Sequence, residues 1–153
     1  MPASIRPRTL LSILCLLSVW LAAAPSWAQT MVSVDRPILN MRSGAGTDNP
    51  VLWALAQGFP LQVMGRKGSW LKVKDFEGDL GWVYQPLVSR KAHVIVRASV
   101  ANVRSAPSTR SQIRGKVQYG EVLRTLEKRK SWIRVQRQSG TQGWIYRPLV
   151  WGW

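Results

Sequence analysis

The chain contains little of what most catalytic and metal-binding sites are made of. Its 153 residues include one Cys, one His and 7 Asp+Glu, against 22 Lys+Arg and a net charge of +15. One Cys cannot form a disulfide within the chain, and one Cys with one His is too few for a multi-ligand zinc site. The 46% share of hydrophobic residues is typical of a folded protein. We therefore expect a folded chain with no metal site and no cofactor.

The first 28 residues have the pattern of a cleavable signal helix. Arg6 and Arg8 give a basic start, residues 10–24 form an apolar run, and Ala28 ends a Ser-Trp-Ala segment with small residues at the −3 and −1 positions. An uncleaved anchor is the alternative, but the run is shorter than the roughly 20 residues that span a bilayer. We expect cleavage after Ala28 and export to the periplasm, with extracellular release as the alternative.

Beyond this signal, the sequence repeats itself at a constant offset of 62 positions, as from Asn40 to Asn102. The matching segments are Asn40–Ser43 with Asn102–Ser105, Ser69–Trp70 with Ser131–Trp132, Gly81–Tyr84 with Gly143–Tyr146, and Pro86–Val88 with Pro148–Val150. An ungapped match of this length indicates a tandem duplication. The domains predicted from it are a signal peptide (1–28), repeat one (30–88), a linker (89–92), repeat two (93–150) and a tail (151–153).

Within each repeat the pattern is that of short strands. Residues 70–74 and 132–136 alternate apolar and polar side chains with a period of two, and Gly78 and Gly140 mark hairpin turns just after them. No stretch of either repeat holds helical apolar spacing over three turns. Short strands separated by turns every ten residues or so predict an all-β protein of two small barrels in tandem.

The shared motifs resemble a known family. Each repeat has Asn-x-Arg-Ser, Trp-x-x-Val, Gly-x-x-Gly-Trp-Val/Ile-Tyr and Pro-Leu in this order, beginning at Asn40 and at Asn102. This order is similar to that of the bacterial SH3-like domain, here present twice and covering nearly all of the chain after the signal. The resemblance implies two SH3-like barrels and a non-catalytic envelope domain, of a kind often attached to wall-remodelling enzymes and credited with binding peptidoglycan or peptide.

Strand alternation also predicts which side chains face outward. If Leu71, Val73 and Val83 fill the first barrel, their neighbours lie on the opposite face, and the second repeat follows the same logic. The predicted ligand-binding residues are Trp70, Lys72, Trp82 and Tyr84 in repeat one and Trp132, Arg134, Trp144 and Tyr146 in repeat two. Aromatic faces pack on sugar rings and peptides, and cations pair with carboxylates. The alternative is that these aromatics only pack, with the Gly before Trp82 and Trp144 admitting a neighbouring chain.

Charge separates the two repeats. Residues 30–88 hold six basic and five acidic residues, a net charge of +1, whereas residues 92–153 hold twelve basic and two acidic ones, a net charge of +10. Repeat two is therefore the candidate for binding anions. Its densest run is Lys128, Arg129 and Lys130, which we expect in a loop between strands and include among the ligand-binding residues. A solvated surface is the alternative for this run.

The functional prediction is a non-enzymatic exported protein that binds peptidoglycan or other anionic cell-wall material, a glycan or a peptide. The alternative is an adaptor that docks an envelope protein. The one close group of carboxylates, Asp75, Glu77 and Asp79, lies in a predicted hairpin turn, and His93 lies at the junction of the repeats with no thiol to activate. Export argues against nucleic acid as a partner. The final Trp151 and Trp153 suit either a membrane surface or packing onto the barrel.

Overall fold

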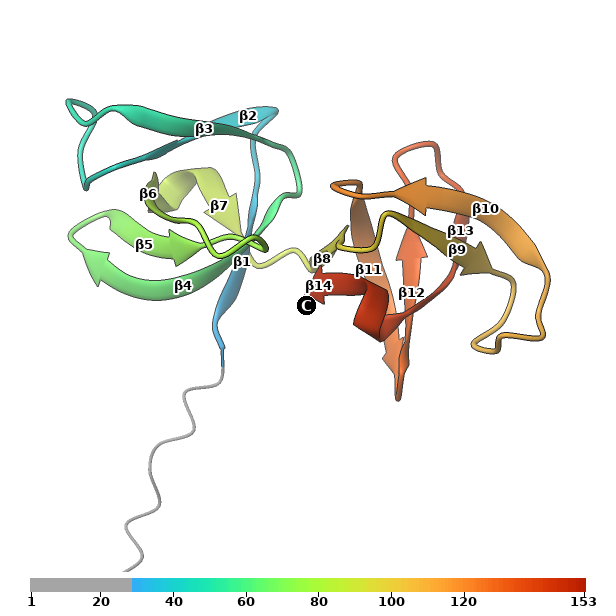
Figure 1. The fold of residues 1–153 in the computed structure, drawn as a ribbon. Coiled ribbons are helices and arrows are strands. Elements are labelled where there is room, and N and C mark those ends of the chain that lie inside the picture. The colour runs from blue at the N-terminus through green and yellow to red at the C-terminus, as the bar shows by residue number, and fades with distance from the viewer. Residues whose placement is uncertain (1–28) are drawn as a thin grey trace, which may run out of the picture.

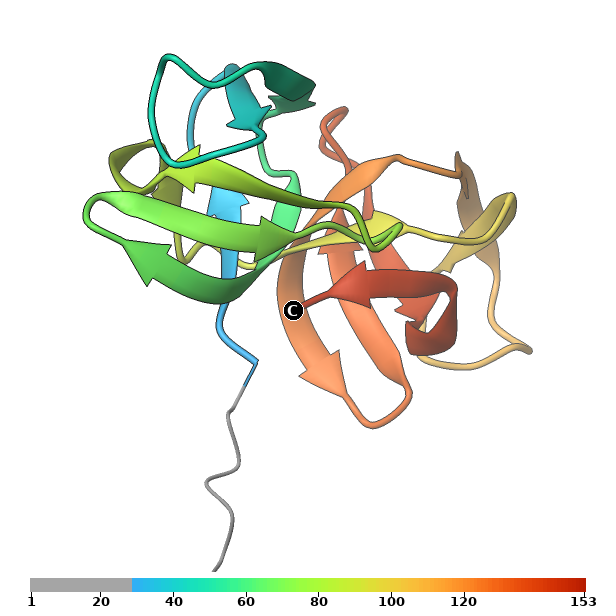
Figure 2. The same cartoon turned by 60° about the vertical axis from the view of Figure 1, so that its left-hand side comes forward.

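The computed structural model describes residues 29–153, so the predicted signal peptide lies outside the described residues. Two seven-stranded antiparallel sheets, each curled on itself, lie side by side in Figures 1 and 2. This confirms the expected all-β fold of two small barrels. Among the described residues, the helical segments are two three-residue 3-10 turns, and no helix is long and apolar enough to span a membrane.

The first barrel is built from seven strands in the order β3-β2-β6-β5-β4-β1-β7. Their bounds are β1 Met31–Val34, β2 Ile38–Arg42, β3 Val51–Ala56, β4 Pro60–Lys67, β5 Trp70–Lys74, β6 Leu80–Tyr84 and β7 Val88–Ser89, with η1 at Gln85–Leu87. The alternation read from the sequence is present in β5, where Leu71 and Val73 are buried and Lys72 is exposed. Burial of every second side chain is what fixes the strand register.

The second barrel repeats this topology strand for strand, in the order β10-β9-β13-β12-β11-β8-β14. Its strands are β8 His93–Val96, β9 Val100–Arg104, β10 Ile113–Gln118, β11 Val122–Arg129, β12 Trp132–Gln136, β13 Gln142–Tyr146 and β14 Val150–Gly152, with η2 at Arg147–Leu149. Strand β14 pairs with β8, Trp151 opposite Ile95. The end of the chain thus packs onto its own barrel.

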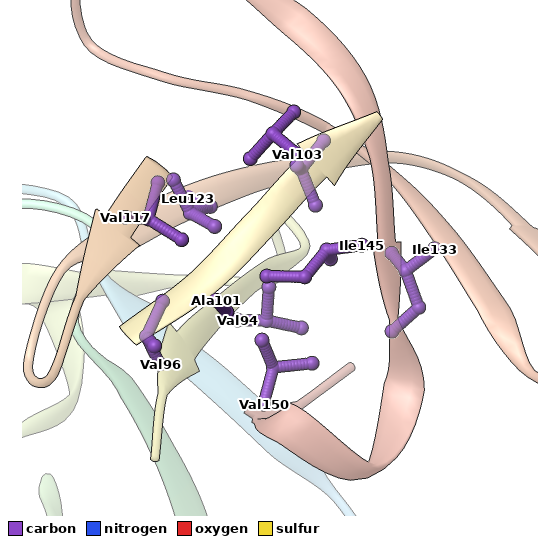
Figure 3. Packing of buried hydrophobic residues seen from close by; sticks show 10 residues of the cluster. Val94, Val96, Ala101, Val103, Val117, Leu123, Ile133, Ile145 and Val150 are labelled. Atoms are coloured by element: carbon purple, nitrogen blue, oxygen red, sulfur yellow. The ribbon is translucent and has the colours of Figure 1, made fainter. Parts of the chain in front are cut away.

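Each barrel has a separate hydrophobic core, so the two repeats are not intertwined. The core residues of the first are Val32, Val34, Leu39, Met41, Leu55, Leu61, Leu71, Val73 and Val83. Those of the second are Val94, Val96, Ala101, Val103, Val117, Leu123, Ile133, Val135, Ile145 and Val150, gathered in Figure 3. Every member of the first list lies 62 positions before a member of the second. The duplication therefore preserves the buried positions.

Two glycines let the barrels close. A Cβ on Gly143 would lie 2.6 Å from the carbonyl oxygen of Arg104, and one on Gly81 would lie 2.5 Å from the Cγ of Met41. The glycine before each Trp therefore lets β6 or β13 pass close against β2 or β9, where an added side chain would have to displace its neighbours. Close approach of a neighbouring chain is thus the reason for both glycines.

Three details of the sequence reading differ from the structure. The run 128–130 is not a loop, because β11 extends through Arg129 and only Lys130 occupies the turn. An Asn side chain often sets a turn by bonding to nearby backbone, which the sequence alone predicts for Asn40 and Asn102, but both residues lie inside strands, β2 and β9. Ser89, placed in the linker, pairs with Ser33 as part of β7. In each case the residues are held in a strand because they pair with a neighbouring strand, and such pairing cannot be read from the local sequence.

The two barrels contact each other at several points. Lys91 forms a 2.7 Å ion pair with Asp35 of the first barrel, and its hydrogen bond holds the pKa of that carboxyl below the usual value. The rings of Phe76 and Tyr119 have centroids 5.4 Å apart, and the Tyr119 hydroxyl donates a hydrogen bond to the Glu77 carboxylate. These contacts join the hairpin turn after β5 to the turn after β10, and they give the pair of barrels a defined mutual placement.

Candidate functional site

Each barrel carries a pair of aromatic rings on the outer face of one hairpin. Trp70 lies opposite Tyr84 across β5 and β6, with ring centroids 5.5 Å apart and planes tilted by 51°. Trp132 and Tyr146 repeat the arrangement across β12 and β13, at 5.5 Å and 57°. Both tyrosines are exposed. The pairs lie on the opposite side of the strands from the core and offer apolar rings with a polar rim to solvent.

A cation accompanies each ring pair, one row further along the hairpin. Lys72 lies opposite the half-buried Trp82 in the first barrel, and Arg134 lies opposite Trp144 in the second. Arg134 donates a 3.0 Å hydrogen bond to the side-chain oxygen of Gln142 and remains exposed. The structure thus brings the eight predicted residues together as two sets of four, one on each barrel.

Trp144 differs from the expectation that it faces outward as an open platform. Trp144 is only 8% exposed, and the Arg129 guanidinium lies over its ring, 5.3 Å from the centroid. Arg129 also forms a 3.0 Å ion pair with Glu127. A cation over an indole face stabilises the packed arrangement. Trp144 is therefore covered, and Arg129 is engaged with groups of its own barrel.

All three residues of the basic run are exposed, and Lys128 and Lys130 are the two that the ion pairs of the described residues do not include. Lys128 is the penultimate residue of β11, and Lys130 adopts a left-handed backbone with φ of 51° at the tip of the β11–β12 hairpin. The corresponding tip in the first barrel is Gly68, with φ of 58°. Because a left-handed conformation favours glycine, the backbone of Lys130 is strained. Its ammonium group lies at the exposed tip of the hairpin.

The arginines of the Asn-x-Arg motifs hold loops. Arg42 donates hydrogen bonds to the carbonyl oxygens of Thr47 and Asn49, at 2.9 and 2.8 Å, and Arg104 donates one to that of Ser111 at 2.9 Å. Guanidinium groups committed in this way satisfy carbonyls that strand pairing leaves free.

The three clustered carboxylates form the hairpin turn that was expected of them. Oδ1 of Asp75 accepts the backbone N–H groups of Glu77 and Asp79, at 2.9 and 2.8 Å. Burial raises the pKa of the Asp75 carboxyl, against the opposing effect of these hydrogen bonds. Ligand atoms of the three residues lie within 4.8 Å of one another, the one such group in the described residues. Because Asp75 holds the turn and Glu77 accepts the Tyr119 hydroxyl, two of the three are already engaged.

Strand β3 is a surface that the sequence reading missed. It ends the sheet of the first barrel and exposes Val51, Leu52 and Trp53, and Trp53 is 52% exposed. The same positions of β10 hold Ile113, Arg114 and Gly115. An apolar edge strand is a surface on which further chains can pair. The 62-residue offset would have revealed the contrast, since Leu52 aligns with Arg114 and Trp53 with Gly115.

The fold and these surfaces define a class of protein: a tandem pair of small barrels with paired aromatic rings and a strongly basic second member. Residues 35–90 and residues 99–150 each match a family described as the bacterial SH3 domain. The chain belongs to this family, with two copies of the domain in tandem, as the motifs indicated.

Comparison with known proteins gives a relative in Bacillus subtilis (strain 168), named "Putative N-acetylmuramoyl-L-alanine amidase YrvJ". The two are 23% identical over 133 residues, which cover 80% of this chain and 25% of the relative. The chain thus spans about a quarter of the length of that protein.

Similar solved structures include NlpC1 from Trichomonas vaginalis, with a TM-score of 0.38 and 17% identity over 88% of this chain and 50% of that one. Another is an NlpC/P60 family protein from Bacillus cereus ATCC 10987, with a TM-score of 0.38 and 15% identity over 81% of this chain and 56% of that one.

Proposed function

We propose that this protein is an exported, non-catalytic binder of peptidoglycan or other anionic cell-wall material. The observation that carries the proposal is the combination, in the second barrel, of a net charge of +10 with the ring pair of the half-buried Trp132 and the exposed Tyr146. The electrostatic potential of so many positive charges raises the local concentration of anionic material, and the aromatic rings supply apolar contact area. The B. subtilis relative, whose name refers to the amide between N-acetylmuramic acid and L-alanine, supports a cell-wall role for the family.

The proposal includes the absence of catalysis. Within residues 29–153, the carboxylates that cluster are those of the turn at Asp75, where two backbone N–H groups occupy the buried oxygen. A glycosidase needs two carboxyl groups facing one another across a scissile bond. Release of soluble fragments from sacculi by the purified protein would contradict this part of the proposal.

Export to the periplasm is the location that fits this role. The basic start at Arg6 and Arg8, the apolar run 10–24 and the small residues ending at Ala28 support it. N-terminal sequencing of the protein from the cell envelope tests the assignment, with Gln29 expected as the first residue. Recovery of the intact chain in the cytosol would contradict it.

An adaptor that docks another envelope protein is the second candidate, and β3 is the observation that favours it. The exposed Val51, Leu52 and Trp53 on a sheet edge suit a protein partner better than a hydrophilic glycan. The Trp53→Ser variant would then lose a protein partner while its retention on cell-wall material stays unchanged.

Retention of residues 29–153 on purified peptidoglycan sacculi, at low and at high salt, tests the main proposal. We expect retention that weakens as salt rises, because exposed charges are screened over about 8 Å at physiological ionic strength. The Lys128→Gln/Lys130→Gln variant should elute at lower salt than the wild type. An Arg36→Gln/Lys67→Gln variant removes two exposed charges from the first barrel and is the matched control. No retention of the wild type at low salt would overturn the proposal.

A further inference from the structure

An open cleft of about 1020 Å³ lies between the two barrels. Its first wall comes from residues 34, 35, 37 and 56–58 of the first barrel, and its second from residues 120–122, 124 and 136–140 of the second. Ligand sites in proteins are clefts of roughly 300 to 1000 Å³, so this one has room for a short peptide. Both barrels contribute lining residues, so the cleft exists only in the tandem arrangement.

The contacts at the junction fix the shape of the cleft. Gly58 packs so tightly against the second barrel that a Cβ there would lie 2.9 Å from Cδ2 of His93 and 3.0 Å from Cγ1 of Val122. The Asp35–Lys91 ion pair also lines the cleft. Since contacts from several elements join the barrels, the walls keep a defined separation, which reduces the ordering cost of binding.

A row of three polar side chains crosses the second wall. His93 of β8 lies opposite Arg124 of β11, and Arg124 lies opposite Gln136 of β12. Because their neighbours Val94, Leu123 and Val135 fill the core, all three side chains lie on the outer face, where they line the cleft.

The charges of the cleft leave one cation without a carboxylate. Asp35 pairs with Lys91, and Glu121 pairs with Arg137 at 2.8 Å, so both acidic residues of the cleft are neutralised. Among the described residues, the ion pairs do not include Arg124, which is exposed. The cleft therefore offers an uncompensated guanidinium, which binds carboxylates through two parallel hydrogen bonds.

The remaining lining favours a peptide. Gln57 faces the cleft from the first barrel, and Gln136 and Gln138 face it from the second. Amide side chains both donate and accept, as peptide groups do. Among the described residues that line the cleft there is no Trp, Tyr or Phe on which a sugar ring or a base could stack.

We infer that the cleft between the barrels binds a short peptide through its free carboxylate, with Arg124 as the pairing cation. The inference rests on the proposed function, since peptides of the cell wall carry such carboxylates. It places the peptide carboxylate at a site distinct from the ring pairs of the outer faces. This site requires both barrels, so a single barrel could not provide it.

The test is a titration of residues 29–153, followed by amide NMR, with short peptides released enzymatically from purified sacculi. We expect shifts at Gln57, His93 and Arg124, and weakening by about tenfold to a hundredfold in Arg124→Gln, the range expected for losing a charged hydrogen bond. Arg110→Gln, at an exposed arginine outside the cleft, is the matched control and should bind as the wild type does. The same peptides with their carboxylates converted to methylamides should lose affinity to a similar extent.

A second variant keeps the test independent of Arg124. Gln57 is exposed at the cleft wall, so Gln57→Trp should narrow the cleft and weaken the shifts while the thermal midpoint stays unchanged. Wild-type affinity in Arg124→Gln and Gln57→Trp, or shifts confined to the ring pairs, would overturn the inference. So would failure of every peptide to bind a wild-type protein that sacculi retain, and that result would leave the proposed function standing. Loss of sacculus retention by the wild type is the separate outcome that removes the proposed function.

Discussion

The two barrels share their buried positions and differ on their surfaces. Each residue in the core of the first barrel has a core partner 62 positions later, and the strand order is the same. The net charges of the two repeats are nevertheless +1 and +10, and an apolar β3 corresponds to a basic β10. The comparison teaches that a small barrel is specified by about ten inward positions, which leaves the outer face free to diverge in chemistry.

The largest effect should come from the core positions that the barrels share. Leu61 and Leu123 are both fully buried, so Leu61→Ala and Leu123→Ala should each lower the unfolding free energy by about 2–5 kcal/mol. Urea denaturation followed by tryptophan fluorescence measures both. Ile38→Ala, at a residue 68% exposed, is the control and should change stability by less than about 0.5 kcal/mol. A large loss in one barrel alone would break the equivalence of the two cores.

Next in size is an asymmetry between the closing glycines. In Gly143→Ala the new methyl meets the Arg104 backbone carbonyl, whereas in Gly81→Ala it first meets the flexible Met41 side chain. We expect Gly143→Ala to cost about 1–3 kcal/mol and Gly81→Ala to cost less, because methionine adapts to crowding. Thermal unfolding compares them, with Gly115→Ala as an uncrowded control. An equal or greater loss in Gly81→Ala would contradict the explanation.

The hairpin tips should give a smaller effect, of opposite sign in the two barrels. Lys130→Gly relieves a left-handed lysine and should raise stability by about 0.5–1 kcal/mol, and Gly68→Lys should lower it by a similar amount. No atom lies within 4 Å of a Cβ built on Gly68, so the backbone alone is tested there. Differential scanning calorimetry should show the two shifts. If Gly68→Lys raised the stability instead, a left-handed lysine would not be strained at this hairpin position, and the strain assigned to Lys130 would be wrong.

The smallest expected effect is the pH response of the junction between the barrels. Burial lowers the pKa of His93 from its usual 6.5. The hydrogen bond to the Lys91 backbone carbonyl and the charge of Asp35 oppose this shift, and the charges of Arg124 and Lys91 add to it. The unfolded chain therefore takes up the proton more readily, and stability should fall as pH drops below about 6.5. The thermal midpoint should decrease from pH 7.5 to pH 6.0 by more in the wild type than in His93→Gln. An identical decrease in both would show that His93 does not cause it.

The strands and the core could be predicted from the sequence because alternation fixes which side chains face inward. Leu71, Val73 and Val83 were predicted to be buried, and they are. The covering of Trp144 could not be predicted, since it depends on Arg129 of β11, which is separated from the strand of Trp144 by β12 and reaches over the ring. The extent of β11 was misjudged for a similar reason: Lys128 and Arg129 carry charge typical of a loop, but pairing with β12 holds them in the strand.

The sequence by itself determined the duplication, the all-β fold, the ring pairs and the charge contrast, because each is written in local spacing or in composition. Only the tertiary structure decided that the barrels meet, which cations are already paired, and that Arg124 lines a shared cleft. These properties join residues from separate strands and separate barrels. Their distances follow from how the two folded units pack, and packing between surfaces leaves no periodic trace along the chain.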